Sequence, residues 1–328
     1  MPDLAQLIAD TPADREAFAA LREMSLPDVD VTLPDADALL TLFLSLAVPF
    51  ADLNPLIGLA ARLRDGEAND LLRLLAGGLV SAMGRPDATL RLPALSTAFV
   101  DPPGYVHLYA ALVVLPYVRR YHEQHGVDAV TSWRTLTDVG RNVAIYRDRY
   151  GVAGFDDIGW ARHHLTGCLY DLGRLQFERG RLGNTFARLM QEDGHDVVAG
   201  EPVISVHIPR FAGPLQADLV EQAFDRARTF FPGRFPGESP RYFVCSSWLL
   251  DPVLGDYLPG HSNILNFLRR FTVRRHDEPD DAGTLLFVYG NPDLPRESYA
   301  RTTSLERGIM AHLDAGEHWH GGRGWLPL

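Results

Sequence analysis

Hydrophobic and polar residues follow two different periods along the chain. In the first half, four segments carry apolar residues at spacings near 3.6, the period of a helix with a buried face. These segments are residues 35–47, 69–83, 104–125 and 132–150. A shorter helix is expected from Asp156 or Asp157 to about Thr166. Thr131 or Ser132 is expected to cap the helix over 132–150, because a side-chain oxygen there can accept an early backbone N–H.

Beyond residue 168 the pattern changes to short strands separated by helices. Strands are predicted over residues 172–182, 202–209, 241–250, 271–276 and 284–289. Helices are predicted over 218–231, over 252–270 with a break at Pro259-Gly260, and over 304–315; the stretch before 202 is expected to be a loop, and 316–328 an irregular or short-strand tail. Helices followed by a mixed sheet predict an α+β protein with two domains, residues 1–165 and 166–328.

Composition and charge narrow the class of protein. The net charge of −11 argues against a general affinity for nucleic acid or for anionic membranes. The longest apolar stretch, residues 39–50, is too short to span a bilayer, and the N-terminus lacks the pattern of a secretory signal. Two cysteines cannot form a disulfide framework. We therefore expect a soluble cytoplasmic protein with no nucleic-acid or membrane partner. The oligomeric state is open, a homodimer included.

A strand that leads through a glycine-containing turn into a helix is the most informative local feature. The strand over 202–209 is followed by Arg210-Phe211-Ala212-Gly213-Pro214-Leu215 and then by the helix over 218–231. Such a turn gathers unpaired backbone N–H groups at the positive end of a helix, and it can bind a pyrophosphate without a lysine. Arg210 can add a charge-assisted contact. An ordinary strand–turn–helix connection has the same pattern and is the alternative.

Several side chains near this turn can take part in proton transfer. His207 lies in the strand before the turn, and its imidazole can accept a proton from an amine near neutral pH. Cys245 and Ser246 lie in the strand over 241–250, without the G-x-S-x-G pattern of a hydrolase nucleophile. Tyr257 follows in the next helix. A structural histidine, a buried cysteine that acts as a small apolar residue and a core tyrosine are the alternatives.

Metal and nucleotide motifs are missing from the sequence. Neither Glu317, His318 and His320 nor His122 and His125 have the spacing of a zinc site such as H-E-x-x-H. There is also no G-x-G-x-x-G loop and no G-x-x-x-x-G-K-[ST] loop. We therefore expect no metal.

Several sequence blocks resemble, in the same order, those of a bacterial N-acyltransferase family. That family joins a helical N-terminal domain to a GNAT-like C-terminal domain. The resemblance is strong over about residues 165–320 and weaker in the helical region that ends at 137–151. The blocks are GRLQFERGRL (173–182), VHIP (206–209) followed by Gly213-Pro214-Leu215, FF-P-x-x-FP (230–236), CSSWLLDP (245–252), YLP (257–259), SNI-x-x-F (262–267) and TSLERG (303–308).

The resemblance implies the fold, the donor and the reaction. In a GNAT-like domain an acyl-CoA or acetyl-CoA thioester lies where two parallel strands separate, and an amine attacks it directly. By order, the strands over 202–209 and 241–250 are that pair, and the turn after the first strand is the CoA site. The implied site residues are Ile208, Arg210, Ala212, Gly213 and Leu215 for CoA, His207 as base, Tyr257 as acid, with Ser246 and Cys245 beside them.

Three positions depart from the family pattern. In the CoA turn, Arg210 and Gly213 fit, but Leu215 stands where the pattern ends in a small residue. The family commonly has histidine where this chain has Ser246. If that histidine is catalytic, its exchange implies either a loss of activity or a transfer of its role to His207. The family usually has glutamine where this chain has Glu306, which would change polarity near the site.

Other functions are compatible with the same resemblance. The main alternative is a non-catalytic GNAT scaffold that binds a CoA thioester or a related ligand. A carrier-protein thioester or an aminoacyl-tRNA as donor is a third reading. The acceptor is expected to be a small-molecule amine. We also expect the N-terminal helices to roof the acyl or acceptor pocket, because residues 105–121 are unusually apolar.

Overall fold

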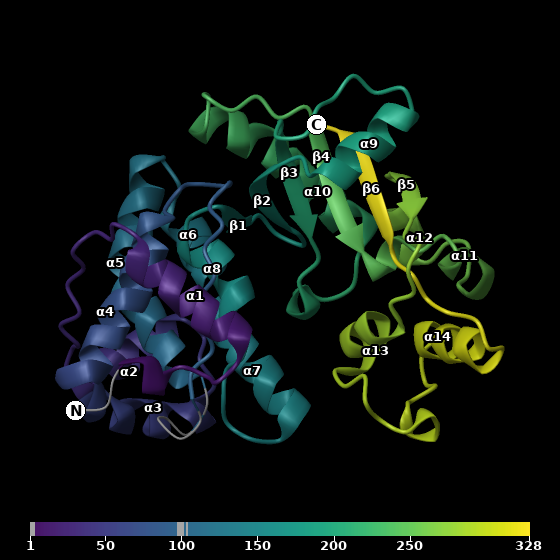
Figure 1. Cartoon of the computed structure of the whole chain (residues 1–328). Helices are drawn as coiled ribbons and strands as arrows, with labels where there is room; N and C mark the ends of the chain where they lie inside the picture. The colour runs from purple at the N-terminus through teal and green to yellow at the C-terminus, as the bar shows by residue number, and fades with distance from the viewer. Residues whose placement is uncertain (1–3, 97–101, 103) are drawn as a thin grey trace. The chain divides into compact units, whose positions relative to one another are not determined.

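The computed structural model describes residues 4–96, 102 and 104–328 (Figure 1). The chain divides into two compact units, Met1–Tyr170 and Asp171–Leu328. The described part of the first unit is mainly helical, and the second contains a mixed sheet flanked by helices. The predicted α+β class, with a helical region followed by a mixed sheet, is confirmed.

The first unit packs its helices around α5. Its elements are η1 (Leu4–Leu7), a 3₁₀ helix, and α1 (Pro12–Glu23), α2 (Ala36–Ser45), α3 (Phe50–Leu63), α4 (Gly66–Ser81), α5 (Tyr105–Gln124), α6 (Ala129–Leu136), α7 (Asp138–Tyr150) and α8 (Ile158–Leu165). α5 is buried along most of its length and contacts α4, α6 and α8. A helix that is covered on most sides is apolar on most sides. Burial within this unit thus accounts for the apolar character of residues 105–121.

Two details of the helical prediction were wrong. The stretch over 132–150 is two helices, α6 and α7, which meet at Thr137. The cap of α6 is Asp128, whose carboxylate accepts the N–H of Thr131 at 2.9 Å. The helix therefore begins three residues earlier than Ser132. The amphipathic helices α1 and α3 were not predicted.

The second unit is built on a sheet with strand order β1-β2-β3-β4-β6-β5. β2 pairs antiparallel with β3, β3 runs parallel to β4, and β6 pairs antiparallel with both β4 and β5. The C-terminal strand, yellow in Figure 1, therefore lies inside the sheet between β4 and β5. The strands are β1 (Leu169–Asp171), β2 (Gln176–Arg181), β3 (Pro202–His207), β4 (Tyr242–Ser247), β5 (Thr272–Arg275) and β6 (Gly322–Pro327).

Helices α9 (Asn184–Glu192) and α10 (Ala217–Arg234) cover opposite faces of this sheet. Met190 of α9 belongs to one apolar cluster with Val203, Val244 and Trp325. On the other face, the Phe224 ring of α10 lies 5.0 Å from the ring of Phe243, between centroids. Successive strand residues point to opposite faces. The two faces can therefore be assigned residue by residue, and we call them the α9 face and the α10 face.

The remaining helices of the second unit form a satellite around α14 (Ser304–Asp314). Short helices α11 (Leu254–Tyr257) and α12 (Asn263–Leu268) follow β4 and the 3₁₀ turn η3 (Trp248–Leu250); α13 (Asp281–Tyr289) and η4 (Arg296–Ser298) follow β5. Residues of α11, α12 and α14 share an apolar cluster with Trp319.

Two predictions for the second unit were wrong. The strand predicted over 284–289 belongs to helix α13, which is capped by Asp280 and ends at Gly290 in the left-handed conformation. Capping residues at both ends favour the helix. The stretch before β3 is not all loop, because it contains α9, whose apolar side packs on the sheet.

Candidate active site

The parallel strands β3 and β4 separate toward their C-terminal ends. Their ladder ends at the pair Ser205–Val244, although β3 continues to His207 and β4 to Ser247. Main-chain N–H and C=O groups on such diverging edges can pair with an extended ligand. The opening between the two strands is therefore a place where a long, narrow substrate can lie.

His207 lies at this opening and is held by a carboxylate. Every second side chain of β3 points to the same face, so His207 lies on the α9 face together with Val203. Its Nε2 lies 2.9 Å from Oε2 of Glu178, and both side chains are partly buried. A carboxylate accepts the proton on Nε2, so the lone pair of the ring is placed on Nδ1. Glu178 thus orients the imidazole and fixes its tautomer.

The turn after β3 is anchored at both ends by Arg174. The guanidinium donates from Nε to the carbonyl oxygen of Pro214 at 3.0 Å and from Nη1 to that of Pro209 at 3.4 Å. Its buried position lowers the pKa of Arg174, but a guanidinium stays charged in proteins. One buried side chain therefore fixes the distance between the end of β3 and the start of α10.

The turn leads to an uncapped helix start. Gly213 has φ +78° and ψ −164°, a conformation that residues with a Cβ rarely adopt. The N-cap of α10, Gln216, makes no side-chain capping bond. The first N–H groups of α10 are thus not satisfied by a cap, and they lie at the positive end of an 18-residue helix. This geometry suits a phosphate.

The other residues predicted to bind CoA are spread around the turn. Arg210 and Ala212 bound the short 3₁₀ helix η2 (Arg210–Ala212). The guanidinium of Arg210 lies beside Gly290 at the end of α13. Ile208 is partly buried, and Leu215 is buried and fastens the turn to the unit.

The two predicted residues of β4 lie on opposite faces. Ser246 is exposed on the α9 face, and its Oγ is 3.5 Å from Nε2 of His276. Cys245 is buried on the α10 face, and burial raises the pKa of its thiol to about 12. A thiol in that environment stays protonated at neutral pH and is a poor nucleophile.

Tyr257 belongs to a separate cluster between α11 and α14. Its hydroxyl is 3.1 Å from Nδ1 of His312, and Nε2 of His312 is 3.1 Å from the carbonyl oxygen of His318. A carbonyl only accepts, so Nε2 of His312 carries the proton and Nδ1 accepts the proton of the tyrosine. To act as an acid, Tyr257 would have to turn its O–H away from His312. Gly308 lets the two helices approach, since a Cβ there would lie 2.8 Å from Cβ of Tyr257.

Glu306 has a structural role. Its carboxylate accepts the N–H of Thr303 at 2.8 Å, and its own N–H donates to Thr303 Oγ1 at 3.1 Å. This reciprocal pair is a capping box, which glutamine fills equally well. The exchange of glutamine for Glu306 therefore preserves the start of α14.

Residues 4–96, 102 and 104–328 contain no group of three or more His, Cys, Asp or Glu side chains placed to hold a metal ion. None of the helices in these ranges combines the length and the apolar character needed to cross a membrane.

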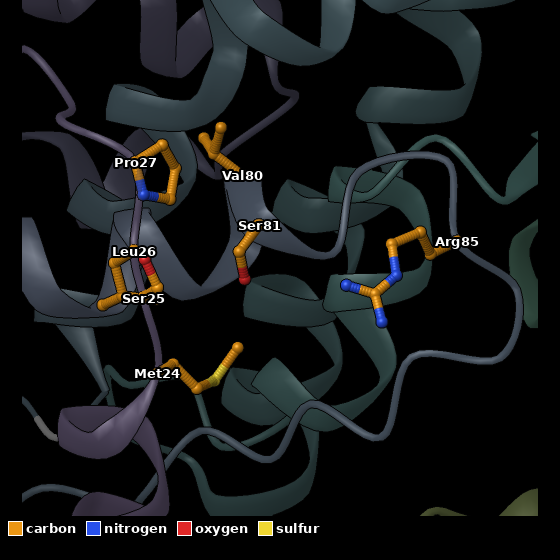
Figure 2. Close-up of a pocket in the computed structure, with 7 residues that line it drawn as sticks. All are labelled: Met24, Ser25, Leu26, Pro27, Val80, Ser81 and Arg85. Carbon is orange, nitrogen blue, oxygen red and sulfur yellow. The ribbon is translucent and has the colours of Figure 1, made fainter.

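The first unit has an open pocket of its own. Figure 2 shows Met24 and Ser81 pointing toward its centre, with Arg85 on the far side. It lies between the end of α1 and the end of α4. The lining residues are Met24, Ser25, Leu26, Pro27, Val80, Ser81 and Arg85.

Four functional candidates were missed by sequence reasoning. Each of the four contacts a predicted residue or the turn. The contacts are Glu178 with His207, Arg174 with the turn, His276 with Ser246, and His312 with Tyr257. The first two lie inside the block GRLQFERGRL, so that block was a usable signal. His276 and His312 carry no local pattern, because the fold brings them to Ser246 and Tyr257 from more than 25 residues away.

Comparison with known proteins agrees with this architecture. Residues 37–167 match the N-acyltransferase N-terminal domain, and residues 169–326 match the GNAT-like C-terminal domain. No match is found among curated proteins. A crystal structure of a mutant of the acyltransferase orf11* in complex with octanoyl-CoA is 33% identical, with a TM-score of 0.87 over 97% of this chain and 96% of that one.

Two further solved structures are similar over the same extent. An acyltransferase in complex with decanoyl-CoA and teicoplanin is 33% identical with a TM-score of 0.85, and one in complex with decanoyl-CoA is 32% identical with a TM-score of 0.86. Each covers 97% of this chain and 96% of its own. The chain therefore belongs to the N-acyltransferase family that joins a helical N-terminal domain to a GNAT-like C-terminal domain, and it is a GNAT-like acyltransferase.

Proposed function

We propose that this enzyme transfers an acyl group from acyl-CoA to a small-molecule amine by direct attack at the opening between β3 and β4. One observation carries the proposal: the parallel ladder stops at Ser205–Val244, and the His207–Glu178 pair lies just beyond it. Acyl-CoA or acetyl-CoA is the donor, which agrees with the octanoyl-CoA and decanoyl-CoA complexes of the relatives. The acceptor amine is the finer part of the proposal.

The turn after β3 binds the phosphates of the donor. The N–H groups at the start of α10 and around Gly213 face the pyrophosphate, and Arg210 adds a positive charge. Ile208 and Ala212 lie along the backbone segment that the donor follows. The buried side chain of Leu215 packs the turn onto the rest of the unit. Arg174 holds the turn in shape before the donor arrives, which lowers the entropic cost of binding.

His207 accepts the proton that the amine must lose. An ammonium transfers its proton to Nδ1 of His207, directly or through one water, and the amine nitrogen then attacks the thioester carbon. Backbone N–H groups at the opening stabilise the oxyanion as the C–N bond forms. When the C–S bond breaks, Tyr257 turns its O–H from Nδ1 of His312 to the thiolate and protonates it. The attacking nitrogen loses its second proton as the amide forms, and water carries that proton to the tyrosinate. Ser246 orders water at the α9 face, and Cys245 supports β4 from the other face.

We also propose the two domains as residues 1–165 and 166–328 and a cytoplasmic location. The compact units and the matched regions both change close to residue 168. Cys168 and Cys245 are both buried thiols, which suits a reducing compartment. The acidic net charge gives no support for a nucleic-acid partner.

A paired substitution of histidines tests the base. His207→Ala should reduce turnover by about 10²- to 10⁴-fold, with Tm and CoA affinity near those of the wild type. The matched control is His195→Ala. The Nδ1 of His195 lies 3.1 Å from Tyr242 Oη, and its Nε2 accepts from Trp325 Nε1 at 3.2 Å. It is a structural histidine, so its loss should lower Tm and spare turnover.

The readout is release of CoA thiol with octanoyl-CoA and a panel of amines. Normal turnover of His207→Ala at pH 7 would exclude His207 as the base. Binding of octanoyl-CoA by the wild type without release of thiol for any amine would favour the non-catalytic alternative instead.

A further inference from the structure

Arg323 places a positive charge on the α9 face without an ion-pair partner among the described residues. Arg323 of β6 lies directly opposite Ser246 of β4 and Arg274 of β5 in the sheet register. Arg323 is two residues before Trp325, and side chains two residues apart on a strand point to the same face. Trp325 packs against α9, so Arg323 lies on the α9 face, as His207 does. The side chain is partly buried. A guanidinium that is partly withdrawn from water is normally paired with a carboxylate.

The nearby carboxylates are bonded to other groups. Asp193 forms an ion pair with Arg274. Asp251 accepts from another arginine and from a backbone N–H, both at 3.0 Å. Asp280 accepts a backbone N–H of α13 at 2.9 Å. In the part of the chain that the structure describes, Arg323 forms no ion pair.

The neighbours of Arg323 supply further hydrogen-bond donors. The hydroxyl of Ser246 is exposed, and it lies 3.5 Å from Nε2 of His276. Burial, together with the charge of Arg323, lowers the pKa of His276. The imidazole is therefore neutral at pH 7 and adds no second positive charge. The result is a guanidinium and a hydroxyl side by side on an exposed face.

The location separates this cluster from the donor turn. The turn after β3 leads into α10, and α10 covers the opposite face of the sheet. Arg323 is two strands away from β3, at about 4.8 Å per strand. A group bound at Arg323 therefore lies on the same face as His207, with β4 between the two residues. An acceptor could reach His207 from that position across β4.

We propose that Arg323, with Ser246 beside it, binds a carboxylate carried by the acceptor, so that the acceptors are amines with a carboxylate, such as amino acids. The inference rests on the proposed transfer to an amine and names the substrate class. A guanidinium binds a carboxylate through two parallel hydrogen bonds, which sets the orientation as well as the affinity. With the carboxylate held at β6, the amine can point toward the β3–β4 opening.

Matched acceptors test this directly. Glycine, β-alanine, 4-aminobutyrate and 6-aminohexanoate are compared with their primary amides, which keep the amine and lose the charge. The readout is kcat/KM for thiol release with octanoyl-CoA. The wild type should prefer the acid of the best-fitting length, and Arg323→Met should reduce that preference by about 10- to 100-fold. Arg323→Lys should retain part of it. Arg274→Met, opposite in the ladder, should leave it unchanged.

Each outcome of this experiment either supports or overturns the inference. The inference is overturned if the wild type acylates amides as well as acids, or if Arg323→Met keeps the preference. It is also overturned if Arg323→Met instead raises KM for octanoyl-CoA but not for octanoyl-dephospho-CoA, since Arg323 would then read the donor phosphate. If no amine is acylated, the proposed function fails. Calorimetry of the same acids and amides on the CoA-loaded protein then still decides whether Arg323 binds the carboxylate.

Discussion

Replacing Arg174 by methionine should loosen the donor turn and weaken CoA binding. The substitution keeps an unbranched apolar stem in a buried site and removes the guanidinium that joins Pro209 to Pro214. The two carbonyl groups then lose their shared donor. The turn keeps the apolar contact of Leu215 but loses its buried polar anchor, and it must be ordered again each time the donor binds.

The size of the effect follows from the two distances. The 3.0 Å bond to Pro214 has normal length for N–H···O, whereas the 3.4 Å bond to Pro209 is beyond the usual range. We therefore count one full bond from a charged donor, worth about 1.5–3 kcal/mol. If that energy must be recovered on binding, Kd for CoA rises by about 10- to 150-fold. If the turn keeps its shape, the same energy is lost from the free energy of unfolding instead.

Calorimetry with CoA and a thermal melt measure both quantities. Arg181→Met is the matched control, because Arg181 lies on β2 and is exposed; it should change neither Kd nor Tm. Arg174→Lys should be intermediate, since a lysine keeps the charge without the fork. A variant Arg174→Met with both wild-type Kd and wild-type Tm would refute the anchoring role.

Substitutions at three further positions, Gly213, Cys245 and Glu306, give additional tests. Gly213→Ala should weaken CoA binding, with a strain of about 1–2 kcal/mol from its positive φ. Gly183→Ala, with equal space and φ −72°, should be neutral; equal calorimetric Kd values would contradict this. Iodoacetamide at pH 8 should leave Cys245 unlabelled until the protein unfolds, and Cys245→Ala should retain turnover; native labelling seen by mass spectrometry would show that the thiol is accessible. Glu306→Gln should keep Tm. Glu306→Ala should lower the free energy of unfolding by about 1 kcal/mol and leave kcat unchanged. A lower kcat in Glu306→Gln would instead indicate that Glu306 has a role in the site.

The sequence allowed the layout of the fold to be predicted where one period dominated. Strand β3 and helix α10 were recognised because alternation gave way to a 3.6 period across a glycine turn. The segment Asp281–Tyr289 was misread because Leu, Phe and Val suit a buried strand as well as a buried helix, and its caps at Asp280 and Gly290 were overlooked. α9 was missed although Phe186, Leu189 and Met190 have helical spacing, because its 9 residues lie in a stretch that was interpreted as one loop on account of its glycines.

The site could be predicted only where its residues are neighbours in sequence. His207 and the turn after it are contiguous, and the residues of one block pointed to both. The residues of β2 beside His207 and those of β6 beside Ser246 depend on the register of strand pairing. They could therefore not be inferred from the sequence. Arg323 is an example: in sequence it lies in a glycine-rich C-terminal tail, and only the pairing of β6 with β4 puts it opposite Ser246.

The exchange of the family histidine for Ser246 is best understood through that same register. Two of the imidazoles on or beside the α9 face lie on either side of β4: His207 on β3, and His276 after β5. His207 is oriented by Glu178, whereas the pKa of His276 is lowered by burial and by Arg323. His207 has a carboxylate within hydrogen-bond distance that can stabilise the imidazolium formed when it takes a proton. At His276, Asp280 and Asp251 favour the charged form less than burial and Arg323 oppose it. The positive charge of Arg323 works against the same change at His276. These charges favour His207 over His276 as the proposed base, and they suit the Ser246 side of β4 to the proposed anion site.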